Sequence, residues 1–160
     1  MAKSKEEKTN VMRTLEQKKL PYTAHTYDPA GPIDGVSVAQ TLGQLPERVF
    51  KTLVTKGASG AYYVFDIPVA ENLDLKKAAK AVGEKSMAML PQKELLPLTG
   101  YVHGGCSPVG MKKQFPTVFH ETVLLYDTVC VSAGKIGFQV ECRPGDLVAL
   151  LRAKTADIIV

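Results

Sequence analysis

The stretch FKTLVTKGASGAYYVFDIPV, residues 50–69, has the pattern of two strands joined by a tight turn. Its outer parts, FKTLVT and AYYVFDIPV, are rich in β-branched and aromatic residues, and KGASG between them has the glycine and serine content of a turn. We therefore predict a β-hairpin here. The sheet to which it belongs must then contain at least one antiparallel pair of strands.

Helices are predicted on both sides of this hairpin. Ser4 and Glu7 have the spacing of a capping box and precede an apolar stripe, which predicts a helix over 4–19. Residues 74–82 place apolar side chains on one face and lysines on the other, and Gly83 is placed to end that helix. Further helical segments are predicted at 37–43, at PQKELLPL (91–98) and at PGDLVALLRA (144–153).

Short apolar segments between these helices have the composition of strands. They do not alternate strictly with helices, which argues against a doubly wound parallel sheet. We predict a mixed α+β fold, in which a mixed, barrel-like sheet of six or more strands is surrounded by helices. Besides the hairpin, the predicted strands are 22–27, SMAML (86–90), YVH (101–103), PTVF (116–119), TVCVS (128–132) and GFQVECR (137–143).

The composition is that of one ordinary globular domain spanning residues 1–160, with 45% hydrophobic residues and no linker. No apolar run approaches the ~18 residues that cross a bilayer, and the N-terminus is charged, so we expect a cytoplasmic protein with no membrane partner. The three cysteines form no C-x-x-C pair and the three histidines are scattered, so no metal site is expected. A net charge of +4 permits a phosphate-rich partner without demonstrating one.

The glycine-rich stretch GYVHGGCSPVGMKK, residues 100–113, has two glycines at the spacing of a P-loop. Met111 stands where the P-loop lysine belongs, so binding of a nucleoside triphosphate is rejected. Two interpretations stay open: a simple turn between strands, which the stretch alone favours, or a set of backbone N–H groups that hold an anion, with Ser107 as a further donor. Cys106 with His103 as its base is a weak candidate for a nucleophile, because residues three apart at a strand end normally point in different directions.

Lys51 is unusual because it lies within the first strand of the hairpin, on the face opposite Phe50 and Thr52. It could protect a sheet edge from aggregation, or it could place an ammonium group in a cavity, where a lower dielectric strengthens its hold on an anion. The stretch VSAGKIGFQVE, residues 131–141, resembles the glycine-rich stretch in chemistry, since Ser132 ends a strand and is followed by Gly134 and Lys135.

Taken together, FKTL, GYVHGGCSPVGMKK and VSAGKIGFQVE resemble the aminoacyl-tRNA editing domains of the YbaK/EbsC type. The resemblance also includes HTYD (25–28) and NLDLKKAAKAVGEK (72–85), and so runs through nearly the whole chain. It implies a free-standing Cys-tRNA(Pro) deacylase, a hydrolase that clears prolyl-tRNA wrongly loaded with cysteine. It also implies a fold similar to the editing insertion of bacterial prolyl-tRNA synthetases.

The resemblance further implies roles for individual residues. Lys51 matches the essential lysine of the family, Gln139 stands where an aspartate is expected, and Cys106 stands where the family tolerates an aliphatic residue. The resemblance implies substrate-binding roles for Tyr27, Thr52, Gly104 and Ser132. The chemistry of the two glycine-containing stretches adds Gly105, Ser107 and Gly134 to the expected substrate-binding residues, and the positive charge makes Lys112, Lys113 and Lys135 the candidate tRNA-binding residues.

The implied chemistry needs neither a metal nor a cofactor nor a nucleophile from the protein. The thiol of the mischarged cysteine attacks its own ester and leaves as a thiolactone, while Lys51 stabilises the developing negative charge. Prolyl-tRNA synthetase is the expected partner. Two alternatives stay open: an editing enzyme of the Ala-tRNA(Pro) type, and a regulatory protein of the same fold that binds tRNA or protein without catalysis.

Overall fold

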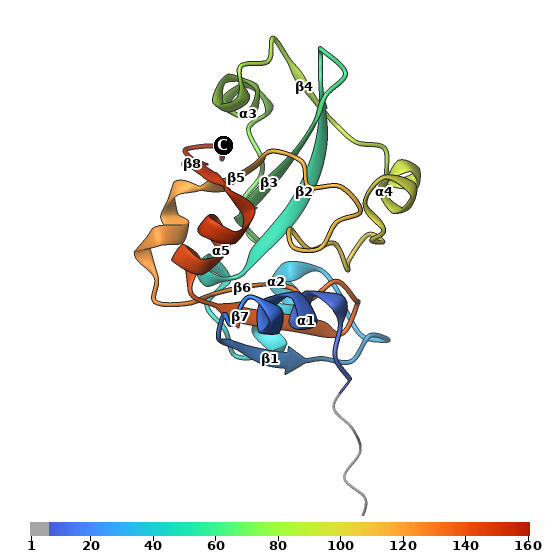
Figure 1. Ribbon diagram of the computed structural model, residues 1–160, viewed down its shortest axis with the longest axis vertical. Coiled ribbons are helices and arrows are strands. Elements are labelled where there is room, and N and C mark those ends of the chain that lie inside the picture. The colour runs from blue at the N-terminus through green and yellow to red at the C-terminus, as the bar shows by residue number, and fades with distance from the viewer. Residues whose placement is uncertain (1–6) are drawn as a thin grey trace, which may run out of the picture.

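The computed structural model describes residues 7–160, and its strands form two open sheets that lie one above the other (Figure 1). The larger sheet has five strands in the order β4-β2-β3-β5-β8, and the smaller one has three in the order β1-β7-β6. The mixed α+β class and the number of strands are therefore as predicted. The barrel-like sheet is not closed, because among residues 7–160 only one isolated bridge, between Val49 and Cys130, joins the two sheets.

The larger sheet is built around the hairpin that the sequence predicts. β2 and β3 are antiparallel, with Lys51 opposite Ile67 and Thr52 opposite Asp66. β4 adds an antiparallel strand beside β2, whereas β5 pairs in parallel with both β3 and β8, so the sheet is mixed. The strands are β2 (Phe50–Gly57), β3 (Tyr62–Pro68), β4 (Met87–Met89), β5 (Thr117–His120) and β8 (Lys154–Ala156).

The smaller sheet brings the first strand, β1, together with two strands from the last third of the chain, β6 and β7. Its central strand β7 is antiparallel to both neighbours, with Tyr22 and Val129 both opposite Cys142. The predicted strand YVH (101–103) is absent from both sheets, and that prediction is wrong. Tyr101 is instead a buried loop residue whose hydroxyl donates to the Val109 carbonyl at 2.5 Å. The strands are β1 (Tyr22–Thr26), β6 (Val129–Ser132) and β7 (Phe138–Cys142).

The helices pack around these sheets and end largely where local signals place them. The first helix begins later than predicted: Thr9 is its N-cap, with Oγ1 accepting from Met12 N, and 7–9 are not helical. Ser4 lies outside the described residues. The helices are α1 (Asn10–Gln17), α2 (Gly35–Thr41), α3 (Leu75–Val82), α4 (Gln92–Thr99) and α5 (Pro144–Leu151), with short 3-10 turns η1 (Pro46–Arg48) and η2 (Glu121–Leu125).

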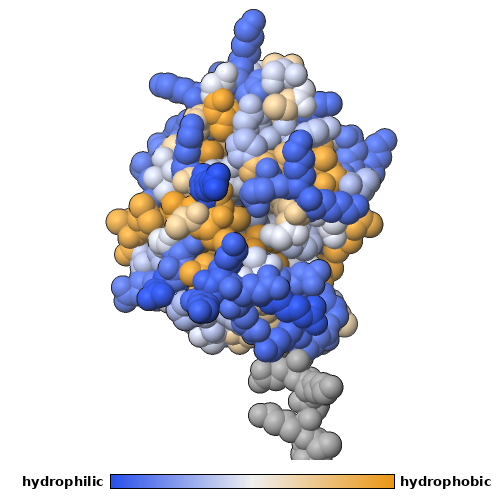
Figure 2. Space-filling model, in the orientation of Figure 1, coloured by the Kyte–Doolittle hydropathy of each residue, from blue (hydrophilic) through white to orange (hydrophobic). Residues whose placement is uncertain are grey.

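The main hydrophobic core includes Val11 and Leu15 of α1, Val140 of β7 and Phe119 of β5, so it connects the two sheets. Figure 2 shows a mostly polar surface, with an apolar area at the left edge over η2, where Leu124 and Leu125 are exposed. Within 7–160, none of the helices has the length and apolar character that a membrane span requires.

Candidate functional site

A cavity of about 430 Å³ lies where the two sheets meet. Its walls come from the start of β2, from α2 and the residues just before it, from the loop at 103–106 and from the ends of β6 and β7. A volume of this size suits a small molecule or the end of a larger one.

Five of the residues that the sequence singles out line this one cavity, although they come from four separate places in the fold. Tyr27 follows β1, Lys51 and Thr52 lie on β2, Gly104 lies in the glycine-rich loop, and Ser132 ends β6. Lys51 thus lines a cavity, as the second explanation for this residue requires.

Lys51 is half-buried, and this determines its electrostatics. Desolvation lowers the pKa of its ammonium, and the charge of Glu71 partly opposes that effect. A cation in such surroundings interacts strongly with any negative charge that enters the cavity. Its position therefore suits a group that stabilises an oxyanion.

Three other predicted contacts, Gly105, Ser107 and Gly134, do not line the cavity. Ser107 is fully buried, and its hydroxyl accepts from Val109 N at 3.2 Å. A Cβ at Gly105 would lie 3.1 Å from the backbone nitrogen of Ile136, and one at Gly134 would lie 2.9 Å from the ring of Tyr101. Gly105 and Gly134 thus let the two glycine-containing loops pack closely.

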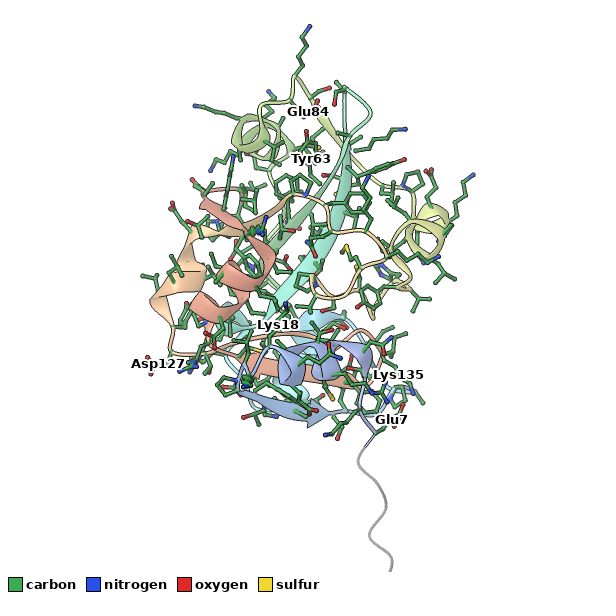
Figure 3. The ribbon with its side chains drawn as sticks, viewed as in Figure 1. Glu7, Lys18, Tyr63, Glu84, Asp127 and Lys135 are labelled. Atoms are coloured by element: carbon green, nitrogen blue, oxygen red, sulfur yellow. The ribbon has the colours of Figure 1, made fainter. Side chains whose placement is uncertain are left out.

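The three candidate tRNA-binding lysines are exposed and lie outside the cavity. Lys135 forms an ion pair with Glu7, which Figure 3 shows at the lower edge of the molecule. Lys112 Nζ lies 3.4 Å from the Pro97 carbonyl, and Lys113 lies over the ring of Phe115. These contacts hold none of the three toward the cavity.

Cys106 also lines the cavity, but its environment does not suit a nucleophile. Burial raises the pKa of its thiol to about 12, and the charge of Asp66 acts in the same direction. The reactive form of cysteine is the thiolate, which is scarce under these conditions. The raised pKa of this thiol therefore argues against a protein nucleophile, although His103 lines the same cavity.

Asp66 is a residue that the sequence analysis missed. It lies on β3 with no exposed surface and accepts a hydrogen bond from Thr52 Oγ1 at 2.6 Å, whereas its Oδ2 has no hydrogen-bond partner among the described residues. Burial raises the pKa of this carboxyl to about 8. A signal was present, since this is the one charged residue in the otherwise apolar strand AYYVFDIPV.

We expect Asp66 to make the stability of the protein depend on pH. Between its usual pKa of 3.8 and about 8, the carboxyl ionises in the unfolded chain but stays neutral in the folded one. Rising pH therefore favours unfolding over this range, at most by about 1.4 kcal/mol per pH unit. Asp66→Asn removes this effect, so the variant should gain unfolding free energy relative to the wild type from about pH 4 to pH 8. Urea unfolding at several pH values measures the difference, and parallel pH profiles would contradict the assignment.

Gln139, at the position where the family pattern suggests an aspartate, lines the cavity and is buried. Its side-chain amide exchanges two hydrogen bonds with Gln44, at 2.6 and 3.1 Å. A neutral amide pair therefore occupies this part of the wall, and no charge is supplied from it.

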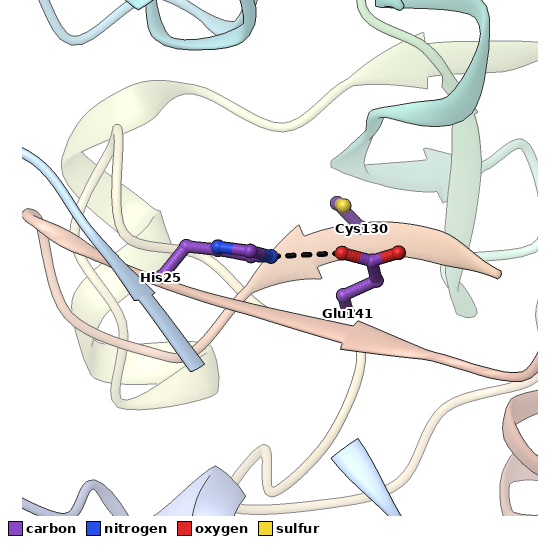
Figure 4. Close-up of side chains that lie close together, drawn as sticks. All are labelled: His25, Cys130 and Glu141. Carbon is purple, nitrogen blue, oxygen red and sulfur yellow. Dashed lines mark hydrogen bonds and ion pairs between the residues drawn. The ribbon is translucent and has the colours of Figure 1, made fainter. Parts of the chain in front are cut away.

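One group of side chains among residues 7–160 has the composition and spacing to hold a metal ion. It consists of His25, Cys130 and Glu141 on the smaller sheet, as Figure 4 shows. None of the three lines the cavity.

Comparison with known sequences assigns the family. Residues 34–150 match the family described as the aminoacyl-tRNA editing domain. The chain belongs to this family. An editing-domain relative from Enterococcus faecalis, EbsC, is 46% identical over 160 residues, which cover 99% of this chain and 98% of the relative. Its name, Cys-tRNA(Pro)/Cys-tRNA(Cys) deacylase, is marked as provisional.

Solved structures agree with this assignment to the editing-domain family. One, described provisionally as a trans-editing enzyme for prolyl tRNA synthetase, has 29% sequence identity and a TM-score of 0.81, with 94% of each chain covered. Another, hypothetical protein APE2540, shares the fold with a TM-score of 0.86 at 23% identity, over 94% of this chain and 99% of the other. The resemblance that the sequence motifs indicate is confirmed.

Proposed function

We propose that the protein is a trans-editing deacylase that hydrolyses mischarged Cys-tRNA(Pro). The observation that carries the proposal is the convergence of Lys51, Gly104 and Ser132 on one cavity, in a chain of the editing-domain family. The name of the Enterococcus faecalis relative supports cysteine as the amino acid that is removed.

The proposed reaction uses the nucleophile that the substrate brings with it. The sulfur of the esterified cysteine bonds to its own carbonyl carbon, and the bond from that carbon to the 3′-terminal ribose oxygen breaks. The thiol proton passes through solvent to the ribose oxygen, and cysteine leaves as a thiolactone. Because thiol and ester belong to one residue, holding them in the right orientation supplies much of the rate enhancement.

The residues around the cavity have distinct roles in this proposal. Lys51 stabilises negative charge on the ester oxygens, and its partial burial strengthens that interaction. The backbone at Gly104 and the hydroxyl of Ser132 bind the aminoacyl-adenosine end, and Tyr27 and Thr52 complete the wall. Lys112, Lys113 and Lys135 contribute phosphate contacts that weaken with salt. Prolyl-tRNA synthetase is the proposed partner, and the cytoplasm, where tRNA is charged, is the proposed location.

The choice of substrate tests the proposed function directly. Cys-tRNA(Pro) should be deacylated at least about a hundredfold faster than Ala-tRNA(Pro) or Ser-tRNA(Pro), because only cysteine carries a nucleophilic thiol beside its ester. The measurement is the release of labelled amino acid from each charged tRNA by the purified protein. Equal rates for alanine would show an Ala-tRNA(Pro) editing enzyme, and no release from any substrate would show a binding protein without catalysis.

A further inference from the structure

Three side chains with metal-binding atoms lie together on the smaller sheet, one on each of its strands (Figure 4). His25 is on β1, Cys130 on β6 and Glu141 on the central strand β7. Cys130 lies directly opposite Glu141, and His25 lies opposite Gln139, two residues from Glu141. Because side chains alternate along a strand, this register places all three on one face of the sheet.

The geometry points to a zinc ion held by His25 Nε2, Cys130 Sγ and one oxygen of Glu141, with a fourth position open to water. One ligand atom from each residue lies within 4.8 Å of the other two. Donor atoms around a tetrahedral zinc lie about 3 to 4 Å apart, given metal bonds of about 2.0 to 2.3 Å. Small rotations of three side chains on a rigid sheet therefore close the site. Nitrogen, sulfur and carboxylate oxygen are the donors that zinc prefers.

The hydrogen bonds around the cluster orient the carboxylate for this role. His25 Nε2 and Glu141 Oε1 lie 2.8 Å apart, and zinc would replace the hydrogen bond between them. The other oxygen, Oε2, accepts from the hydroxyl of Thr128, which in turn accepts from Arg48 Nη2 at 2.9 Å. Such outer contacts fix the direction in which a ligand points.

The charges of the ligands match a divalent ion. The hydrogen bond from Thr128, followed by that from His25, lowers the pKa of Glu141, so its carboxylate is ionised. Cysteine binds zinc as the thiolate, so zinc binding at Cys130 must release the thiol proton to solvent. The thiolate and the carboxylate then balance the two charges of zinc. The positive charge of Arg48 favours the ionised forms of Cys130 and Glu141, but it also repels a zinc ion bound between them.

The sequence analysis predicts no metal site, because the histidines and cysteines are scattered along the chain. The pairing of β1 with β7 brings residues that are distant in the sequence into contact. The same face of β6 and β7 also carries Ser132 and Gln139, which line the cavity. A zinc ion here would therefore cross-link the three strands beside the cavity without entering it.

Cobalt(II) is the probe that tests the ligand set, because a thiolate bonded to cobalt gives a charge-transfer absorption in the near ultraviolet. The full chain with reduced thiols should bind one cobalt ion with this band, and zinc should abolish the band by displacement. Cys130→Ala should remove the band. Cys142→Ala is the matched control, since Cys142 is equally buried but lies on the opposite face of β7, and it should keep the band.

Two variants with partly exposed side chains test the site without relying on a core substitution. His25→Gln and Glu141→Gln should each weaken zinc binding at least about tenfold, since even groups that only orient a ligand are worth that much. Zinc should raise the melting temperature of the wild type and leave that of Cys130→Ala unchanged. A wild-type protein without the cobalt band, a band that persists in Cys130→Ala, or zinc affinity unaffected by the His25 and Glu141 variants would overturn the proposal. None of these measurements involves tRNA, so they are independent of the proposed deacylase activity.

Discussion

Lys51→Ala should lower the rate of Cys-tRNA(Pro) deacylation by about two to three orders of magnitude, because a preorganised group that stabilises an oxyanion typically contributes that much. Lys51 lines the cavity and its ammonium is partly desolvated, so water cannot replace it without a loss of electrostatic stabilisation. The effect should appear mainly in kcat, since the charge that Lys51 stabilises is largest in the transition state. Single-turnover release of cysteine from charged tRNA measures it.

Lys56→Ala is the matched control for this experiment. Lys56 lies on the same strand as Lys51, but its side chain is exposed and lies over the ring of Tyr62, away from the cavity. The control should deacylate at the wild-type rate, and both variants should unfold at similar urea concentrations. A Lys51→Ala protein with normal activity would remove Lys51 from the mechanism.

Gly104→Ala should reduce deacylation by an order of magnitude or more while the protein still folds. Gly104 has a φ of +88°, where a residue with a Cβ is strained by about 1 to 2 kcal/mol. The added Cβ would also lie 2.8 Å from Ile33 Cδ1, and both residues line the cavity. The wall of the cavity must therefore shift, and a misplacement of about 1 Å at a reacting centre can cost about a hundredfold in rate.

Gly60→Ala separates backbone strain from the change in the cavity. Gly60 has a φ of +93° and nothing within 4 Å of its Cβ position, so its substitution introduces strain alone. It lies in the hairpin turn, at the end of the larger sheet far from the smaller one (Figure 1). The two variants should lose similar stability in urea unfolding, and only Gly104→Ala should lose activity. Equal activity in both would show that the backbone at Gly104 makes no contact with the substrate.

Local chemistry explains the elements that the sequence predicts well. The hairpin follows from the composition of residues 50–69. α3 begins after Asp74, whose carboxylate accepts hydrogen bonds from Lys76 N and Lys77 N, and it ends at Gly83, which has a φ of 75°. These signals depend only on residues within a few positions of one another. The cavity residues Tyr27, Lys51 and Gly104 are predicted for a different reason, because the resemblance to a family indicates which residues act together.

Other features depend on contacts between distant parts of the chain, which the sequence pattern does not encode. The division into two sheets follows from the pairing of β1 with β7, and the strand pattern of YVH is overridden by the burial of Tyr101 in a loop. The neutral state that burial favours for Asp66 and the cluster of His25 with Cys130 likewise exist only because of tertiary packing.

The order of the strands along the chain has a consequence for synthesis. β1 is made early, but its partner β7 ends at Cys142, and four of the five strands of the larger sheet, up to His120, are made between them. A chain emerging from the ribosome therefore holds β1 without a partner until nearly all of it has been translated, and closing so long a loop slows folding. Truncated products that contain only one of the two sheets would lack part of the pocket wall, so ribosomes that stall early should release no active hydrolase.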